Sequence, residues 1–576
     1  MLQTPPLGAD GFYHPTTEDE IIALVQKAAG EKLEIRCRGA AHSLARAIYT
    51  DPGKGDPQLP NVVSEQAPPK GSNLNVMFDQ YAKLVWVDKA AGIIEVEAGI
   101  HLGYDPEDPT MTSTLENSLL YQAFINGFTL SDLGGISHQT ISGFLMTGSS
   151  GGSLMYSIDE NIMGLSVIDG NGDLQWFNKG DDDFGAVVLS LGLLGIVSKV
   201  KLQLAPLFNI YGQQITYPTQ PAACPIDLFG SGSPGKPSFE DFLKATPYTR
   251  VLWWPQEKVE RVVIWEASRG TAMPVFDPAP YEEFEKNSLA SNIEQLLASM
   301  LFTMLGNSKF WVVWQKLKPS FTEFRRLTEQ SWGGGFFARV IAWLLTGVLK
   351  VIGFILVFFF MTFKGLLHAL YPFVINTLQP LTKKGNAQLF MDYTYSSLPM
   401  DNGANDILMG TEFTEIWIPL SDTEKAMKLL DKMFKEGKFA ATGYYSTELY
   451  AGKQSNYWMS PAYQQDVLRI DFFWFSTNEG NPAAKDGFFS QFWEALKNEN
   501  IDFRLHWAKF LPEYDFPGWA SYISKSYPRW NDFMALREKR DPNNIFLTDY
   551  WSRHLFGKEK DGLKSAMDTL AEVKTV

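Results

Sequence analysis

The sequence predicts an α+β protein with more than one domain, and three observations lead to this prediction. The chain has 576 residues, which is too long for one compact core. Its first ~200 residues alternate short apolar strands with glycine-rich loops, which is typical of an α+β domain. Its middle contains an apolar stretch, 336–373, that follows neither pattern. We therefore expect two lobes and a hydrophobic helical insertion.

The composition narrows the class of partner. A net charge of −15 argues against nucleic acid, because phosphate binding needs a basic surface. Cys37 and Cys224 are the two cysteines, which is too few for a disulfide framework. The first residues lack the basic start and apolar core of a secretory signal, so we expect no signal peptide and a cytoplasmic location for the active site. The aromatic share of 14% indicates large apolar cores, an apolar pocket or contact with lipid.

A helix opens the predicted first domain. Thr17 and Glu20 form a capping box, apolar residues follow at helical spacing, and Gly30 is a stop signal. Residues 33–37 then alternate apolar and charged side chains, as a half-buried strand does. This strand leads into 38–43, where small residues allow a tight turn and a close approach of the backbone.

Two β-hairpins are predicted next. Residues 84–87 pair with 93–97 across a short turn, and 165–168 pair with 174–177 across the turn D-G-N-G. Between them lies a loop region rich in glycine and serine, 134–152. Residues 189–204 end this domain with an apolar strand after a turn at Gly192 and Gly195.

The apolar middle favours contact with a membrane. Residues 351–363 carry no charge, but a span takes about 20 residues, and extending the segment to 340 places Lys350 in mid-span. Between 309 and 364 there are eight Lys or Arg residues against two acids. Basic residues interleaved with aromatic ones are typical of segments lying in a membrane interface. A true span and a buried hairpin of apolar helices are the alternatives.

Regular patterning returns after 385. Residues 414–419 and 467–475 read as strands, and 422–434 read as an amphipathic helix. Among motifs with known chemistry, HExxH, paired CxxC and a complete P-loop are absent, and no GxGxxG follows a predicted strand as a Rossmann site requires. We therefore expect no metal site and no Rossmann dinucleotide site.

Residues 36–43, with the sequence R-C-R-G-A-A-H-S, resemble the first flavin loop of the vanillyl-alcohol-oxidase (PCMH-type) superfamily, and in particular its aldonolactone oxidase and alditol oxidase branch. That branch has R-x-R-G-x-G-H-S, so Ala41 replaces a glycine. The resemblance implies a two-lobed PCMH-type FAD-binding domain with FAD bonded covalently to His42. Residues 139–152 resemble the second flavin segment. The implied cofactor-binding residues are Arg38, Gly39, Ala40, Ala41, His42, Ser43, Gln139, Thr140, Gly143, Gly148, Ser149, Ser150, Gly152, Ser153 and Ile196.

The C-terminal region carries an independent match. Residues 506–509 (H-W-A-K) resemble the family's H-W-G-K, and 527–550 resemble its closing pattern. The resemblance covers roughly 1–205 and 405–555. It implies an FAD-binding domain at 1–205 and a substrate or cap domain at 206–480, with a hydrophobic membrane-docking insertion at about 295–378. Residues 481–576 would close the active site and pack back on the FAD domain.

The substrate wall departs from the family. Glu448 and Lys509 keep the family's glutamate and lysine, but Tyr450 stands at the arginine position and Asp471 at the histidine position. Glu448 is the expected base or hydroxyl-positioning group, with Asp471 second, and Lys509 would offset developing negative charge. His506 is either catalytic or structural.

The loss of two hydrogen-bond donors, with Tyr450 and Tyr463 as expected substrate contacts, favours an apolar alcohol. The leading hypothesis is therefore FAD-dependent oxidation of an alcohol group on a lipophilic, membrane-resident substrate such as a sterol or lipid alcohol. The flavin would be reoxidised by O₂ or another acceptor, at the cytoplasmic face of a membrane. The alternatives are an aldonolactone or polyol oxidase and a non-catalytic flavin-containing membrane scaffold.

Overall fold

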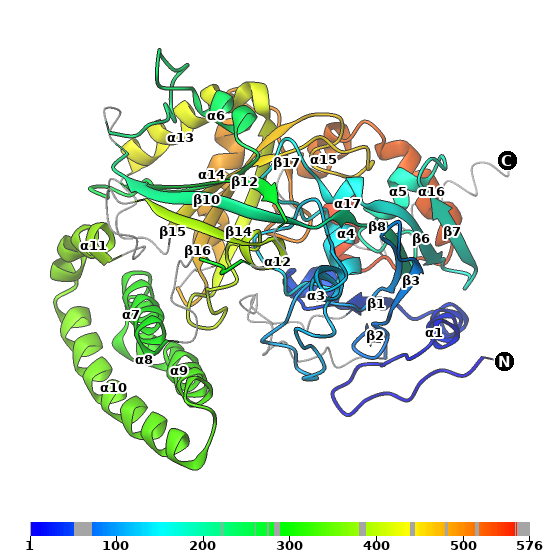
Figure 1. The fold of residues 1–576 in the computed structure, drawn as a ribbon, viewed down its shortest axis with the longest axis horizontal. Helices are drawn as coiled ribbons and strands as arrows, with labels where there is room; N and C mark the ends of the chain where they lie inside the picture. The colour runs from blue at the N-terminus through cyan, green and yellow to red at the C-terminus, as the bar shows by residue number, and fades with distance from the viewer. Residues whose placement is uncertain are drawn as a thin grey trace.

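The computed structural model describes residues 2–50, 72–219, 223–259, 261–272, 276–280, 288–378, 387–437, 444–478, 482–512, 518–558 and 560. Figure 1 shows an N-terminal lobe, a second lobe built on a large sheet, and a group of helices that extends from the second lobe. The α+β architecture predicted from the sequence is confirmed.

The N-terminal lobe is built around a five-stranded sheet of order β3-β4-β8-β6-β7, beside a parallel pair β1-β2. Both predicted hairpins are present, as β3-β4 and β6-β7. Thr17 caps the first helix by accepting a hydrogen bond from the Glu20 backbone N–H. The elements are α1 (Glu18–Glu31), β1 (Ile35–Arg38), α2 (Ala45–Ile48), β2 (Leu74–Met77), β3 (Leu84–Asp88), β4 (Ile93–Glu97), α3 (Leu119–Phe124), β5 (Phe128–Thr129), α4 (Ile141–Thr147), η2 (Ile158–Glu160), β6 (Ile162–Ile168), β7 (Leu174–Asn178), α5 (Phe184–Val188), β8 (Ile196–Gln203) and β9 (Ala205–Pro206).

The second lobe is built on an eight-stranded sheet of order β13-β10-β12-β11-β15-β16-β14-β17. Alternate residues of its strands face opposite sides. One side packs under α6, α13 and α14 (Figure 1), and the other faces the insertion helices and the N-terminal lobe. The elements are β10 (Phe208–Tyr217), α6 (Phe239–Ala245), β11 (Tyr248–Trp254), β12 (Arg261–Thr271), β13 (Gln388–Tyr393), α12 (Thr394–Ser397), β14 (Thr411–Pro419), η3 (Leu420–Asp422), α13 (Thr423–Gly437), β15 (Tyr444–Gly452), β16 (Val467–Phe475), α14 (Pro482–Asn498) and β17 (Arg504–Leu505).

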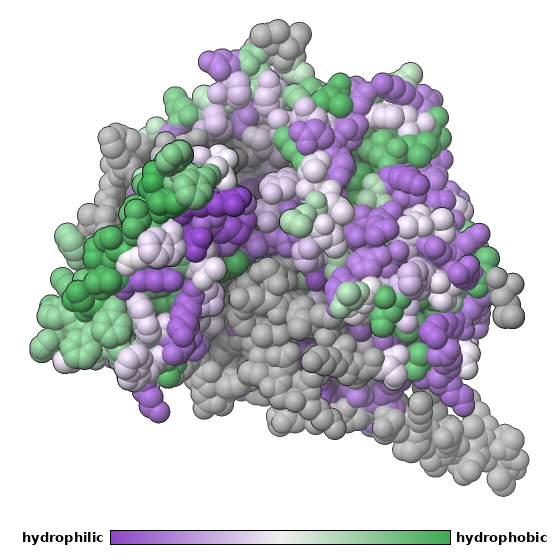
Figure 2. Space-filling model, turned by 90° about the horizontal axis from the view of Figure 1, so that it is seen from below, coloured by the Kyte–Doolittle hydropathy of each residue, from purple (hydrophilic) through white to green (hydrophobic). Residues whose placement is uncertain are grey.

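The insertion consists of five helices: α7 (Leu289–Leu305), α8 (Phe310–Lys316), α9 (Lys318–Ser331), α10 (Phe336–Thr362) and α11 (Lys364–Leu378). Helix α10 buries a narrow stripe against its neighbours, formed by Ala338, Ala342, Thr346, Gly353 and Val357. Most of its other side chains are large, apolar and exposed, and Figure 2 shows hydrophobic residues gathered along this edge of the molecule. Among the described residues, α10 alone is long and apolar enough to cross a membrane.

The C-terminal helices α15 (Trp519–Ser526), α16 (Trp530–Arg540) and α17 (Asp549–Phe556) return to the N-terminal lobe (Figure 1). The Ile35 N–H donates to the Ile545 carbonyl over 2.8 Å. The Trp551 indole N–H donates to the Ala47 carbonyl over 3.0 Å. The N-terminal lobe is therefore completed by residues more than 500 positions away in the chain.

Candidate active site

A cavity of about 960 Å³ lies where both glycine-rich loops meet the C-terminal segment. Its walls are residues 35–43 from β1 and the loop after it, 139–147 from α4 and the residues before it, the turn at 191–197, and Trp507, Ala508, Phe546 and Trp551. A β-carbon added to Gly39 would lie 2.2 Å from Oγ1 of Thr140. The two loops can therefore approach this closely only because residue 39 has no side chain. Small residues therefore form the part of the cavity wall where the two loops meet.

This cavity fits FAD. The two loops approach each other closely at Gly39 and Thr140, and close backbone approach is what pyrophosphate binding requires. Ala41 has a left-handed backbone with φ of 60°. This is the conformation in which glycine is favoured, so the alanine keeps the loop geometry of the glycine that it replaces in the resemblance.

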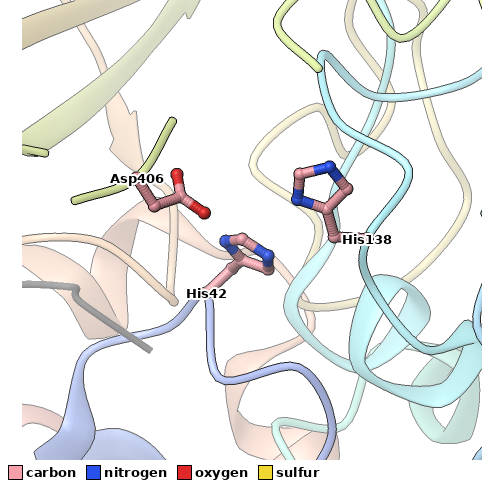
Figure 3. Close-up of side chains that lie close together, drawn as sticks. All are labelled: His42, His138 and Asp406. Carbon is pink, nitrogen blue, oxygen red and sulfur yellow. The ribbon is translucent and has the colours of Figure 1, made fainter. Parts of the chain in front are cut away.

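His42 lies at the end of this cavity and also lines a second one. Its Nε2 is buried and has no hydrogen-bond partner among the described residues. Burial lowers the pKa of His42 to about 3, and His138 adds to this effect, so the imidazole is neutral at physiological pH. Figure 3 shows His42 between Asp406 and His138, whose ring centroid is 5.5 Å from that of His42. His138 lies in a loop, and its side chain is buried.

The second cavity, about 1320 Å³, is walled by the sheet face that looks toward the N-terminal lobe. Three acids face it in one row across adjacent strands. Glu415 of β14 is paired with Asp471 of β16, and Asp471 is paired with Glu448 of β15. Burial raises the pKa of Asp471 well above its ordinary value, and repulsion by Glu415 adds to this shift. Asp471 therefore holds its proton more tightly than an ordinary carboxyl group does.

Arg469 holds this row against the second flavin loop. Its Nε donates to Glu415 over 2.8 Å, and its Nη1 donates to the carbonyls of Ser150 and Gly151 over 2.7 and 3.0 Å. Burial alone would raise the pKa of Glu415, but the charge of Arg469 outweighs it and the pKa is lowered. The carboxylate form of Glu415 is therefore favoured, while its neighbour Asp471 holds its proton more tightly.

A second cation, Arg250, lies near Glu448 at the other end of this row of acids. Arg250 of β11 forms an ion pair with Asp401, and its Nε lies 3.8 Å from Oε1 of Glu448. The Tyr450 hydroxyl donates to Asp401 over 3.4 Å. Arg250 and Arg469 thus lie on the two strands that flank β15. In the family that the sequence resembles, the arginine stands on β15 itself, at the position of Tyr450.

Lys509 connects the two cavities. Its Nζ donates to the His42 carbonyl over 3.4 Å, and burial lowers its pKa from the ordinary value. His506 also lines the second cavity. Its Nδ1 accepts from the Ala508 N–H over 3.2 Å, and burial lowers its pKa to about 4. His506 is therefore neutral and braces the turn that carries Lys509.

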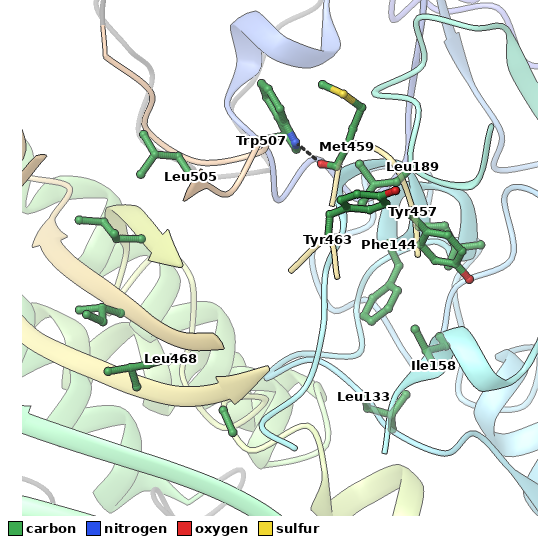
Figure 4. Close-up of a cluster of buried hydrophobic side chains, with 14 of the residues drawn as sticks. Leu133, Phe144, Ile158, Leu189, Tyr457, Met459, Tyr463, Leu468, Leu505 and Trp507 are labelled. Atoms are coloured by element: carbon green, nitrogen blue, oxygen red, sulfur yellow. Dashed lines mark hydrogen bonds between the residues drawn. The ribbon is translucent and has the colours of Figure 1, made fainter. Parts of the chain in front are cut away.

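Most residues that the sequence predicted for the site come together. The first cavity is lined by Arg38 through Ser43, Gln139, Thr140, Gly143 and Ile196, and the second by Ser149, Ser150, Glu448, Tyr450, Asp471, His506 and Lys509. Gly148, Gly152 and Ser153 are not among the residues lining either cavity. Neither is Tyr463, which packs with Tyr457 in the hydrophobic core near Trp507 (Figure 4).

Five charged residues of the second cavity or its rim were missed: Arg250, Asp401, Asp406, Glu415 and Arg469. Glu415 could have been found, because the strand alternation at 414–419 predicts that one face of this strand carries it. Nothing in the local pattern around Asp401 or Asp406 indicates a site, since both lie in a loop without regular structure.

Comparisons with known proteins agree with this geometry. Residues 353–554 match the family model described as D-arabinono-1,4-lactone oxidase. L-gulonolactone oxidase of Scyliorhinus torazame is 22% identical over 551 residues, with 95% of each chain covered. D-arabinono-1,4-lactone oxidase of Saccharomyces cerevisiae is 24% identical over 274 residues, which cover 45% of this chain and 41% of that one.

A solved structure shares the fold. Cholesterol oxidase from Brevibacterium sterolicum superposes with a TM-score of 0.58 at 12% identity, covering 94% of this chain and 93% of the other. Two glycine-rich loops and the cavity between them therefore occur on a fold shared with this oxidase. The chain is an FAD-dependent oxidoreductase that acts on CH–OH groups, and it is similar to the aldonolactone oxidases.

Proposed function

We propose that this protein oxidises a CH–OH group of a small, polyhydroxylated molecule such as an aldonolactone. The observation that carries this proposal is the chemistry of the second cavity. Glu415, Glu448, Asp471, Arg469 and Lys509 all line it, and such groups are matched by several hydroxyl groups and not by a hydrocarbon skeleton. The aldonolactone oxidase relatives support the same substrate class.

The chain's own residues divide the work. Glu448 takes the proton of the reacting hydroxyl, because it is a carboxylate-forming group on the cavity wall beside Arg250. Asp471, as a neutral acid, donates a hydrogen bond to a substrate oxygen. Lys509 stabilises negative charge that develops near His42. Bound FAD supplies the acceptor for the hydride that leaves the same carbon.

We also propose that His42 holds the flavin covalently. Its neutral Nε2 has a lone pair, is buried without a partner, and lies where the two cavities join. A flavin held there would be reoxidised by O₂ or by another acceptor.

A lipophilic alcohol is the second candidate. Tyr450 in place of an arginine and the exposed apolar face of α10 favour it. The charged row opposes it, since a sterol would leave Glu415, Asp471 and Glu448 buried without hydroxyl partners. Tyr463, an expected substrate contact, packs in the hydrophobic core and does not line the second cavity.

Anaerobic bleaching of the flavin absorbance separates these candidates. We expect L-gulono-1,4-lactone or D-arabinono-1,4-lactone to bleach it, and a sterol and a long-chain alcohol to leave it unchanged. Bleaching only by the lipophilic alcohols would overturn the proposed substrate class. No bleaching by any of them would favour a flavin-containing scaffold.

We further propose that α10 lies in the interface of a membrane and does not cross it. Its two cations, Arg339 and Lys350, are eleven residues apart and so lie about 20° apart around the helix, next to the buried stripe. The opposite face carries no charge. Helix α9 packs along α10 and carries Arg325, Arg326 and Glu329. A spanning α10 would draw these charges into hydrocarbon.

Vesicle flotation tests this orientation. The double variant Val348→Glu with Ile355→Glu places charge on the exposed face of α10 and should reduce binding to anionic vesicles at least ~10-fold. The matched control, Val85→Glu with Val87→Glu, changes two exposed valines of β3 and should bind like the unaltered protein. Equal loss in both variants, or in neither, would contradict an α10 interface.

A further inference from the structure

The loop between α12 and β14, residues 401–410, forms one wall of the second cavity. Asp401, Ala404, Asp406, Met409 and Gly410 line the cavity. The loop consists of turns without a helix or strand. Its position must therefore be set by what it contacts, because it has no regular hydrogen bonding of its own.

Asn405 is the residue through which the insertion holds this loop. Its backbone N–H donates to Oε1 of Gln295 on α7 over 2.8 Å, and its Nδ2 donates to Oε1 of Glu323 on α9 over 2.8 Å. Its Oδ1 accepts from the N–H groups of Ile407 and Leu408 over 3.0 and 2.9 Å. Its carbonyl accepts from Met409. Every polar group of Asn405 is used, and two of them bind different insertion helices.

The partners of Asn405 are themselves fixed. Gln295 also donates to the Gly403 carbonyl over 3.4 Å. Glu323 accepts from Nε of Arg326 over 2.8 Å, and Arg326 reaches Glu107 of the N-terminal lobe over 3.1 Å. The clamp therefore joins the insertion, the cavity wall and the flavin-binding lobe.

The loop also acts on the reacting end of the cavity. Asp401 pairs with Arg250 and accepts from Tyr450, and Arg250 is 3.8 Å from Glu448. If the loop moves outward, Asp401 leaves Arg250, and the guanidinium charge is then compensated more by Glu448. A closer cation stabilises the carboxylate and makes it a weaker base.

We propose that Asn405 is a positioning residue for the oxidation: held by α7 and α9, it keeps Asp401 on Arg250 and so preserves Glu448 as a base. The insertion is thus part of the active-site scaffold as well as a membrane surface. This inference rests on the proposed role of Glu448. The groups that face Glu448 are Arg250 of β11, Asp471 of β16, Tyr450 of its own strand and, through Arg250, Asp401 of the loop.

The test compares three variants with the unaltered full-length holoprotein, using the lactone that bleaches the flavin. Asn405→Ala removes both side-chain links and should lower kcat/KM by ~10- to 100-fold, mainly through kcat. The acidic limb of its pH–rate profile should move down by about one unit. Glu323→Ala should act in the same direction, and Glu323→Gln, which keeps an acceptor for Asn405, should restore most of the activity.

Arg325→Ala is the matched control, because Arg325 on the same helix pairs only with the neighbouring Glu329 among the contacts the structure records, on the exposed side. It should leave kcat, KM and the pH profile unchanged. Unchanged kinetics in Asn405→Ala, or a fall in kcat without a shift of the acidic limb, overturns the positioning role. If Asn405→Ala does not fold, equal kcat/KM in Glu323→Ala and Glu323→Gln overturns it. Failure of the unaltered protein to bleach with any lactone overturns the proposed function instead.

Discussion

Glu448 and Asp471 face each other directly across β15 and β16, and both line the second cavity. Burial and the neighbouring Glu415 keep a proton on Asp471 by raising its pKa. Two acids side by side thus have separate tasks, one donating a hydrogen bond and the other taking a proton.

Substituting each acid by its amide tests this division. Asp471→Asn replaces a neutral acid with a neutral amide of the same shape and should keep kcat/KM within a few-fold. Glu448→Gln removes the base and should lower kcat/KM by ~10²-fold or more. Stopped-flow measurement of flavin reduction gives both values. Losses of similar size would show that Asp471 also works as a carboxylate.

Removing the imidazole of His42 tests the covalent link. His42→Ala should release all flavin from the protein on denaturation in acid, while the unaltered protein keeps it on the peptide that contains residue 42. His138→Ala is the control, since its ring lies 5.5 Å from that of His42 but does not stand at the family's attachment position. Mass spectrometry of the peptides reads out both. An unmodified residue-42 peptide in the unaltered protein would refute covalency.

The left-handed backbone at Ala41 should make glycine the more stable residue there. A non-glycine residue in this region costs roughly 1 kcal/mol, so Ala41→Gly should raise the free energy of unfolding by about that amount and the melting temperature by about 1 °C. Ala40→Gly, at a neighbouring residue without positive φ, should lower stability by about 0.5–1 kcal/mol. Thermal unfolding of the two holoproteins checks the opposite signs.

The buried Asp132 should make stability fall as pH rises. Burial raises its pKa to about 8, although the hydrogen bond from the Leu133 N–H favours the charged form. The folded chain thus binds this proton more tightly than the unfolded chain does. The stabilisation that this proton gives the folded state is complete below about pH 4 and is lost as pH rises toward about 8.

Asp132→Asn keeps the neutral form at every pH. We expect its melting temperature to equal that of the unaltered protein at pH 5 and to exceed it at pH 8. Asp181→Asn, an exposed acid near the β7–α5 turn, should show no such difference. A variant that is less stable than the unaltered protein at pH 8 would contradict the assignment.

Local patterns were sufficient to predict many elements. Residues 467–475 were predicted as a strand and form β16 with the same bounds, and both hairpins were found because alternation and turn residues are local signals. The helix predicted at 422–434 is α13, Thr423–Gly437. The flavin cavity was also predicted, because its two loops carry their signal in short contiguous motifs.

The substrate cavity was predicted only in part, because it depends on strand register. Glu415 becomes part of the site through its pairing with Asp471, and Arg250 through the neighbouring β11. Neither pairing can be read from one segment. Tyr463 was expected to contact the substrate, but its side chain packs in the hydrophobic core and does not line the second cavity. The domain boundaries at 205 and 480 stay predictions.

The closure of the flavin cavity by Trp507, Ala508 and Trp551 has a consequence for biosynthesis. The first flavin loop lies within the first 43 residues, but the C-terminal residues that cover it are synthesised much later. Hydrogen bonds of Ile35 with Ile545 and of Ala47 with Trp551 join the two segments. While the chain is still on the ribosome, the loop that carries His42 has no finished pocket. Cofactor capture therefore follows translation, and a nascent chain must keep this half-built lobe from aggregating until residue 551 has emerged.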